Sequence, residues 1–326
     1  MSFGKKIPPE ESLARYKVAD SQMPGKEADD QTGQSKDSDQ ALKLLERFES
    51  RAPRYRMDDL ILPEGVRQEI KTLKSRINNH ALIYREWGFQ KIDPVGISVA
   101  VNYYGPPGTG KTMCAEALAS DLGQPILEIN YAEIESKYVG ETPKNIVAAF
   151  AQAKKSNALL FFDEADSILG RRLTNVTQSA DHGVNVSRSV MLKQLDSFDG
   201  IVVFATNLAK NFDGAFVRRI LQHVYVPLPD EACRLELWKR MIGVSVPGRD
   251  MIDFDNLAKE SVCFSGGLIK NAVLLALCEV ASREKSLQML NQSDLIRSLQ
   301  GVRRASQEIG QSHSVWTEIK QPPTEM

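Results

Sequence analysis

The fold of this chain is decided by Gly105-Pro106-Pro107-Gly108-Thr109-Gly110-Lys111-Thr112. This stretch matches the pattern G-x-x-x-x-G-K-[ST], in which the glycines let backbone N–H groups turn toward a phosphate. An apolar run, Val99–Tyr104, precedes it and predicts a strand, and Lys111–Asp121 reads as a helix. Strand, loop and helix in this order predict a triphosphate site at a helix N-terminus rather than an ordinary Gly/Pro turn. We expect Lys111 to reach the β- and γ-phosphates and Thr112 to ligate Mg²⁺.

Four further apolar runs follow, and helical stretches separate them. The predicted strands are Ile126–Asn130, Leu159–Asp163, Ile201–Thr206 and His223–Val226. The predicted helices of this region are Glu64–Asn78, Lys111–Asp121, Pro143–Lys154, Asp166–Leu169 and Val186–Phe198. Apolar strands that alternate with helices predict an α/β domain over residues 54–229, with a five-stranded parallel sheet covered on both faces.

Beyond Pro227-Leu228-Pro229 the pattern is helical only, which predicts a small all-α domain over residues 230–304. Its predicted helices are Glu231–Met241, Phe254–Glu260, Leu268–Glu284 and Ser293–Gln300. Residues 1–40 are polar and predict a disordered N-terminal arm, and residues 41–53 predict a linker helix. Residues 305–326 predict a flexible tail.

Composition excludes several classes of protein. The chain has 326 residues with 41 Lys plus Arg and 42 Asp plus Glu, so its net charge of -1 argues against a broadly basic nucleic-acid binder. Its four cysteines form no CxxC pair, which argues against a zinc site or a disulfide scaffold. The sequence shows neither a secretory signal nor an apolar run of about 18 residues, so we expect a cytoplasmic protein without a membrane span.

Polar side chains end two of the buried strands. Asp163 and Glu164 follow Leu159–Phe162, and parallel strands place such residues beside a phosphate loop. We expect Asp163 to hold Mg²⁺ and Glu164 to act as general base toward water, although both could simply begin a helix. Asn207 follows Ile201–Thr206 and could orient the attacking water or serve as a turn residue.

Together these motifs resemble those of AAA ATPases in the narrow sense. The similarity covers about residues 54–285 and includes three further segments: Met57–Glu64, Asp213–Ile220 and Val226–Arg240. The resemblance implies a P-loop NTPase fold with a helical lid, and hexameric rings that bind ATP between subunits. The chain departs from many members at Gln222-His223, where they carry a basic pair.

The resemblance also implies roles for individual residues. Glu164 and Asp163 form the Walker B pair, Asn207 is sensor 1, and Arg218 and Arg219 are arginine fingers that enter the neighbouring subunit's site. The residues expected at the nucleotide are Asp59, Leu60, Ile61, Pro107, Gly108, Thr109, Gly110, Lys111, Thr112, Met113, Gly266 and Gly267.

A loop decides the predicted function. In the family, the segment containing Lys137, Tyr138 and Val139 faces a central pore, where an aromatic side chain can grip an extended polypeptide. Tyr138 could instead pack on the helix that follows. We therefore expect a Mg²⁺-ATP-hydrolysing homo-hexamer that remodels, unfolds or disassembles a protein substrate, reached directly or through an adaptor. The alternatives are a nucleotide-dependent scaffold or switch with slow hydrolysis, and a nucleic-acid motor or loader.

Overall fold

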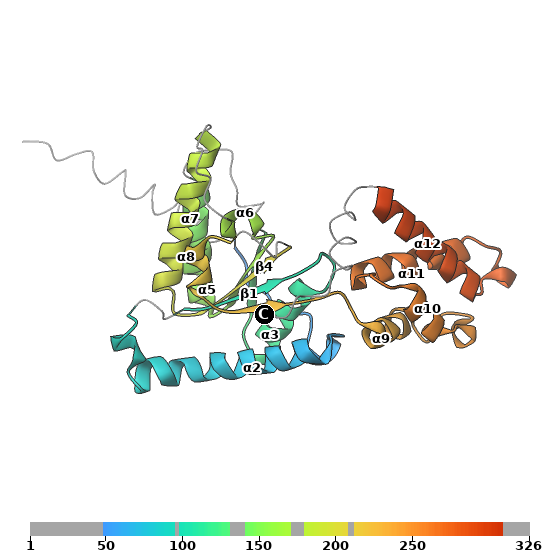
Figure 1. The fold of residues 1–326 in the computed structure, drawn as a ribbon, viewed down its shortest axis with the longest axis horizontal. Helices are drawn as coiled ribbons and strands as arrows, with labels where there is room; N and C mark the ends of the chain where they lie inside the picture. The colour runs from blue at the N-terminus through green and yellow to red at the C-terminus, as the bar shows by residue number, and fades with distance from the viewer. Residues whose placement is uncertain (1–47, 95–97, 131–140, 171–178, 208–211, 309–326) are drawn as a thin grey trace, which may run out of the picture. The chain divides into compact units, whose positions relative to one another are not determined.

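A five-stranded parallel sheet forms the centre of the α/β region (Figure 1). The computed structural model describes residues 48–94, 98–130, 141–170, 179–207 and 212–308. The strands are β1 (Val99–Tyr104), β2 (Ile126–Asn130), β3 (Leu159–Asp163), β4 (Ile201–Thr206) and β5 (Ile220–Tyr225). Their order in the sheet is β2-β3-β4-β1-β5, which places β1 between β4 and β5.

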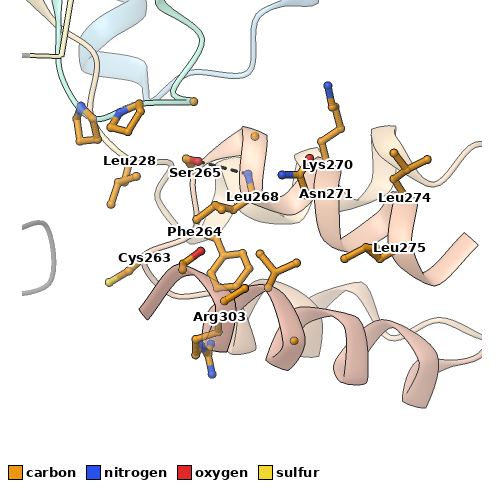
Figure 2. A pocket seen from close by; sticks show the side chains of 18 residues that line it. Leu228, Cys263, Phe264, Ser265, Leu268, Lys270, Asn271, Leu274, Leu275 and Arg303 are labelled. Atoms are coloured by element: carbon orange, nitrogen blue, oxygen red, sulfur yellow. Dashed lines mark hydrogen bonds between the residues drawn. The ribbon is translucent and has the colours of Figure 1, made fainter. Parts of the chain in front are cut away.

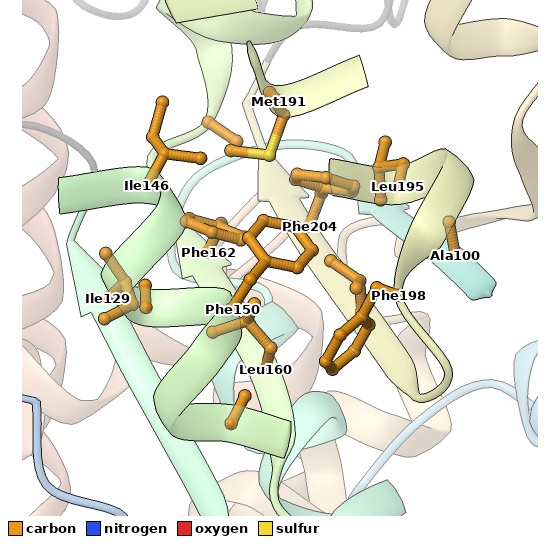
Figure 3. Close-up of a cluster of buried hydrophobic side chains, with 14 of the residues drawn as sticks. Ala100, Ile129, Ile146, Phe150, Leu160, Phe162, Met191, Leu195, Phe198 and Phe204 are labelled. Carbon is orange, nitrogen blue, oxygen red and sulfur yellow. The ribbon is translucent and has the colours of Figure 1, made fainter. Parts of the chain in front are cut away.

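Helices cover both faces of the sheet (Figure 1). On one face lie α2 (Glu64–Ala81) and α3 (Lys111–Asp121), and on the other lie α5 (Glu141–Ser156) and α7 (Ser179–Ser197). Figure 3 shows the second face, where Phe150 of α5 packs between Phe162 of β3 and Phe198. Phe204 of β4 stacks on Phe162 at 5.5 Å between ring centroids. Burial of these large aromatic side chains stabilises the sheet and fixes its strand ends.

The register brings the carboxyl ends of the central strands together. Tyr104 of β1 lies opposite Thr206 of β4, and Phe162 of β3 lies opposite Phe204. Two short helices follow β3 and β4 in the chain: α6 (Asp166–Leu169) and α8 (Gly214–Val217). Ligands of parallel α/β sheets bind at this edge, where the connections on either side of β1 lead to opposite faces.

The region after β5 is helical. It contains α9 (Glu231–Met241), α10 (Phe254–Glu260), α11 (Gly266–Ala281) and α12 (Gln292–Glu308). Trp238 is fully buried at its centre, and its indole N–H donates to the Ser261 hydroxyl at 3.0 Å. Every helix in the described ranges is too short or too polar to cross a lipid bilayer. The remaining short helices are η1 (Met57–Asp59), η2 (Leu82–Glu86), η3 (Phe89–Lys91), η4 (Arg249–Met251) and η5 (Lys285–Leu287).

The structure confirms the α/β fold with its five-stranded parallel sheet and the bounds of four strands. The predicted start of the fifth strand was wrong. Strand β5 begins at Ile220, not His223, because Ile220 already pairs with Ala100 of β1. The polar pair Gln222-His223 concealed this start, since it interrupts the apolar pattern. The last predicted helix was too short, as α12 continues through Glu308 and passes the expected boundary at residue 304.

The predicted linker helix at 41–53 is wrong for the part that the structure describes. Residues 48–50 are not helical, and Arg51 forms an antiparallel bridge with Ile126 of β2. The edge of the sheet thus takes up backbone hydrogen bonds that a helix would have used, with Arg51 N donating to Ile126 O at 2.9 Å. Residues 1–47, which include the predicted arm, lie outside the described residues, and so does 309–326 of the predicted tail.

Candidate functional site

The glycines of the loop between β1 and α3 adopt backbone conformations that other residues avoid. Gly105, Gly108 and Gly110 have φ of 145°, 73° and 98°. A Cβ added at Gly105 would lie 2.3 Å from the carbonyl oxygen of Val226, and one at Gly108 would lie 2.8 Å from the Ser265 hydroxyl. The loop therefore needs glycine at these two positions for space as well as for φ. It ends in the first turn of α3, whose free N–H groups and dipole favour an anion.

The side chain of Lys111 lies across this loop. It is 8% exposed, and its Nζ donates to the carbonyls of Gly105 at 2.9 Å and Pro106 at 2.8 Å. A third bond, also 2.8 Å long, reaches Oδ1 of Asn207 beyond the end of β4. Burial lowers the pKa of Lys111, and nearby carboxylates oppose that effect. The ammonium group is thus held at the sheet edge among acceptors that triphosphate oxygens could replace.

Two oxygen groups suited to Mg²⁺ meet at the end of β3. The Thr112 hydroxyl donates to Oδ2 of Asp163 at 2.9 Å, and Oδ1 of Asp163 accepts from the backbone N–H of Glu164. Mg²⁺ prefers hard oxygen ligands and is usually held by one or two carboxylates plus substrate phosphates. A hydroxyl and a carboxylate at the phosphate loop fit that requirement.

Glu164 has a strained backbone, with φ of 53°, and its side chain is exposed. A non-glycine residue in this region costs about 1–3 kcal/mol and persists only where its surroundings fix it. Asp166 supplies part of that fixation, because its carboxylate accepts from the Thr206 hydroxyl and, at 3.0 Å, from the backbone N–H of Asn207. These contacts tie the segment after β3 to the end of β4.

Arg218 and Arg219, predicted as an equivalent pair, differ in the structure. The Arg219 guanidinium forms a two-pronged ion pair with Asp196 of α7 at 2.6 and 2.9 Å, and this hydrogen bonding raises the pKa of Arg219. Arg219 also donates to the Ala215 carbonyl. Arg218 is exposed, and its guanidinium forms no hydrogen bond or ion pair within the described part of the chain.

The helical region contacts the phosphate loop directly. The backbone N–H of Gly267 donates to the Gly108 carbonyl at 3.1 Å, and the Ser265 hydroxyl caps α11 by accepting from Leu268. Arg240 of α9 donates to the carbonyl of Asp59 at 2.7 Å. A cavity of about 750 Å³ lies beside this contact, and Figure 2 shows side chains that line it. Pro106, Pro107 and Gly108 line one side of it, and α11 and α12 line the other.

Comparison with known proteins agrees with this geometry. Residues 101–228 match the family model described as "ATPase family associated with various cellular activities (AAA)". Residues 101–228 thus form an AAA domain.

The curated proteins to which this chain is similar include the following three. It is 34% identical over 217 residues to "26S proteasome subunit RPT4" of Saccharomyces cerevisiae, covering 64% of this chain and 48% of the relative. It is 34% identical over 193 residues to "ATP-dependent zinc metalloprotease FtsH" of Lachnoclostridium phytofermentans, covering 57% and 33%. It is 32% identical over 223 residues to "Spastin" of Drosophila willistoni, covering 62% and 28%. The chain thus spans half or less of the length of these relatives.

The AAA fold brings most of the sequence-predicted site residues together. The loop residues, Asp163, Glu164 and Asn207 meet at one sheet edge. Leu60 is buried in the core beside α3, and Asp59 ends η1, which packs on α3. Lys137, Tyr138 and Val139 lie outside the described residues.

Two residues of the AAA site were not assigned roles from the sequence. Asp166 could have been found, because a carboxylate three residues after Asp163 begins a predicted helix. Asp196 could not, because nothing in the sequence indicates that a carboxylate of α7 pairs with Arg219 across 23 positions.

Proposed function

We propose that this chain is a Mg²⁺-dependent ATPase whose nucleotide lies between two copies of the chain. The observation that carries the proposal is the meeting of Lys111 Nζ with the Asn207 amide at the phosphate loop, beside the Thr112–Asp163 pair. Three further groups support it: the N-terminus of α3, the exposed Glu164 and the glycine turn. The AAA domain points to the same reaction.

Each side chain has a part in the proposed hydrolysis. Lys111 exchanges its carbonyl partners for β- and γ-phosphate oxygens, and Asn207 turns toward the attacking water. Glu164 takes a proton from that water as its oxygen bonds to the γ-phosphorus, and the bond to the β–γ bridging oxygen breaks to give ADP and phosphate. Mg²⁺ held by Thr112 and Asp163 would neutralise charge on the phosphate oxygens.

The two arginines take different roles in this proposal. Arg218, exposed at the end of α8, reaches the γ-phosphate bound by the next copy. Arg219 stays within its own chain, because its guanidinium already forms a bidentate ion pair with Asp196. A guanidinium supplied from outside the pocket is worth about 10³–10⁵ in rate in related nucleotidases.

We further propose that a ring of six copies uses this hydrolysis to pull on a protein. The named relatives support a protein substrate: one is a proteasome subunit and another a metalloprotease. The segment with Lys137, Tyr138 and Val139 would grip the polypeptide, because an aromatic side chain gives a large contact area at low entropic cost.

Steady-state ATP hydrolysis tests the catalytic part. Glu164→Gln keeps the size of the side chain but removes the base, so we expect nucleotide affinity to remain and kcat to fall by about 100-fold or more. An unchanged kcat would refute the assignment.

An unfolded model protein, offered as a probe, tests the mechanical part. We expect it to stimulate ATP hydrolysis, and Tyr138→Ala should abolish that stimulation while basal turnover stays within about twofold. Stimulation that survives Tyr138→Ala would refute gripping by this residue. A lack of any stimulation, together with stable binding of the probe in ATP, would favour a scaffold over a motor.

A further inference from the structure

Two polar side chains from neighbouring strands contact each other on one face of the sheet, away from the groups proposed to react. Asn102 of β1 and His223 of β5 are directly opposite each other in the register. The Asn102 amide nitrogen lies 3.3 Å from Nδ1 of His223, which places an amide donor against a ring acceptor. Asn102 is fully buried, and it sits on the strand between Ala100 and the start of the phosphate loop.

Stability alone does not explain the presence of the Asn102–His223 pair. Oδ1 of Asn102 is buried and has no hydrogen-bond partner within the described ranges. A buried acceptor of this kind destabilises the folded state, whereas an apolar side chain of similar size carries no such cost. The neighbouring residue across the sheet, Phe204, is apolar and belongs to the hydrophobic cluster of this face. The presence of the pair therefore calls for a reason other than packing.

His223 supports the turn that carries Arg218. The ring of His223 lies 5.9 Å from that of Phe212, just before α8. Burial lowers the pKa of His223, and Nε2 of its ring is buried without a hydrogen-bond partner within the described ranges. Phe212 directly precedes Asp213, whose carboxylate caps α8 by accepting from the backbone N–H of Ala215, and Arg218 follows α8. His223 is thus in contact with Asn102 on one side and, on the other, with Phe212, where the segment that carries Arg218 begins.

We infer that Asn102 and His223 are a positioning pair that fixes the Arg218 turn relative to the strand leading into the phosphate loop. Asn102 stands three residues before Gly105, and His223 contacts Phe212, six residues before Arg218, so the pair joins the two halves of the site. The Arg219–Asp196 ion pair holds the same turn from the side of α7. The inference rests on the proposed role of Arg218 at the nucleotide of the next copy.

The reason for such fixation is geometric. Arg218 must meet a phosphate bound by another molecule, so its turn has to keep one position relative to its own domain. A displacement of about 1 Å at a reacting centre can cost on the order of 100-fold in rate. A small rotation of α8 on the sheet would produce a displacement of that size.

The double variant Asn102→Leu/His223→Leu in the full chain tests the inference. It replaces both polar groups with apolar ones, so we expect the free energy of unfolding to stay equal or to rise. We also expect kcat for ATP to fall by about tenfold and KM to change by less than about twofold. Phe150→Leu, in the core on the same side of the sheet, is the matched control: it should lower stability and leave kcat unchanged.

The variant Arg218→Ala tests whether the Asn102–His223 pair acts through Arg218. Because the pair acts through Arg218, adding both leucines to Arg218→Ala should cause no further loss of kcat. If the leucines lower kcat equally in both backgrounds, the inference is overturned. If Arg218→Ala lowers kcat and the leucine variant does not, the inference fails while the proposed function stands. If Arg218→Ala itself has no effect, both are overturned.

The milder single variant His223→Gln covers the case in which the double variant does not fold. Its amide can still bond to Asn102, so kcat should lie within about threefold of the parent, whereas Asn102→Val should lose about as much as the double variant. Equal kcat for these two single variants would contradict the inference.

Discussion

Substitution of Glu116 by glutamine gives a sharp test of how the segment before η1 is anchored. Glu116 lies on α3, five residues after Lys111, and its side chain is completely buried. Its carboxylate accepts from the Arg51 guanidinium at 2.9 and 3.1 Å. It also accepts from the backbone N–H and the guanidinium of Arg54, both at 2.7 Å. Glu116→Gln keeps the volume but turns one acceptor into a donor that faces donors.

The expected cost follows from the charge of Glu116. Burial alone would raise its pKa, but hydrogen bonds from Arg51 and Arg54 outweigh burial and lower the pKa from 4.5 to about 2. That difference corresponds to at most about 3 kcal/mol of stability. Both arginines are partly exposed and can be hydrated when the carboxylate is lost, so we expect a loss of about 2–3 kcal/mol.

Denaturant titration of the parent and of Glu116→Gln measures this cost. Arg85→Gln is the matched control, because Arg85 and Asp199 form a pair that is 61% and 53% exposed and should contribute less than about 1 kcal/mol. A carboxylate with a lowered pKa stabilises the folded state above its unfolded pKa and loses that effect as pH falls through the folded value. The stability gap between parent and Glu116→Gln should therefore be constant above about pH 5.5 and shrink between about pH 4.5 and pH 2.

Two results would refute this reasoning. One is a loss for Glu116→Gln no larger than that for Arg85→Gln, which would mean that the buried contacts contribute nothing beyond a surface pair. The other is a stability gap that stays constant as pH falls below 4.5, which would mean that the charge of Glu116 is not responsible.

The remaining predictions concern the loop and the arginine turn. Gly105→Ala should cost at least about 2 kcal/mol more than Gly110→Ala in thermal unfolding, because only the first places a Cβ against backbone, although both have positive φ; equal costs would contradict the close approach of Val226. Asp196→Ala should free Arg219 and lower the kcat for ATP by about tenfold with KM unchanged, as measured by ATPase kinetics. A kcat equal to that of the parent would show that Asp196 does not position the turn. Thr112→Ala should raise the Mg²⁺ concentration needed for half-maximal ATPase activity by about tenfold, and an unaltered Mg²⁺ dependence would exclude Thr112 as a ligand.

Much of the fold follows from the sequence because the central strands β1, β3 and β4 are short, largely apolar and buried on both faces. Such runs end where a polar residue appears, as at Asp163 and Asn207, so their bounds and the functional edge can be predicted together. Strand β5 shows the limit of this rule. Its interior holds Gln222 and His223, and its pairing with β1 overrides the polar pattern.

The contacts that hold the site could not be predicted in the same way. Glu116 lies in a helix beside alanines, and its partners Arg51 and Arg54 are more than 60 positions away. Arg218 and Arg219 are adjacent and chemically identical, and only the place of Asp196 distinguishes them. Such pairings depend on tertiary packing, which local patterns do not contain.

The central claim is that two copies of this chain share each nucleotide, and mixing two inactive variants tests it most directly. Lys111→Ala should lose nucleotide binding but keep Arg218, whereas Arg218→Ala keeps its pocket but has no guanidinium to offer. We expect each variant alone to hydrolyse ATP at less than about 1% of the parent rate, and the mixture to recover activity well above the sum of the two. Full activity of Arg218→Ala alone, or no recovery in mixed assemblies verified by mass, would contradict the account.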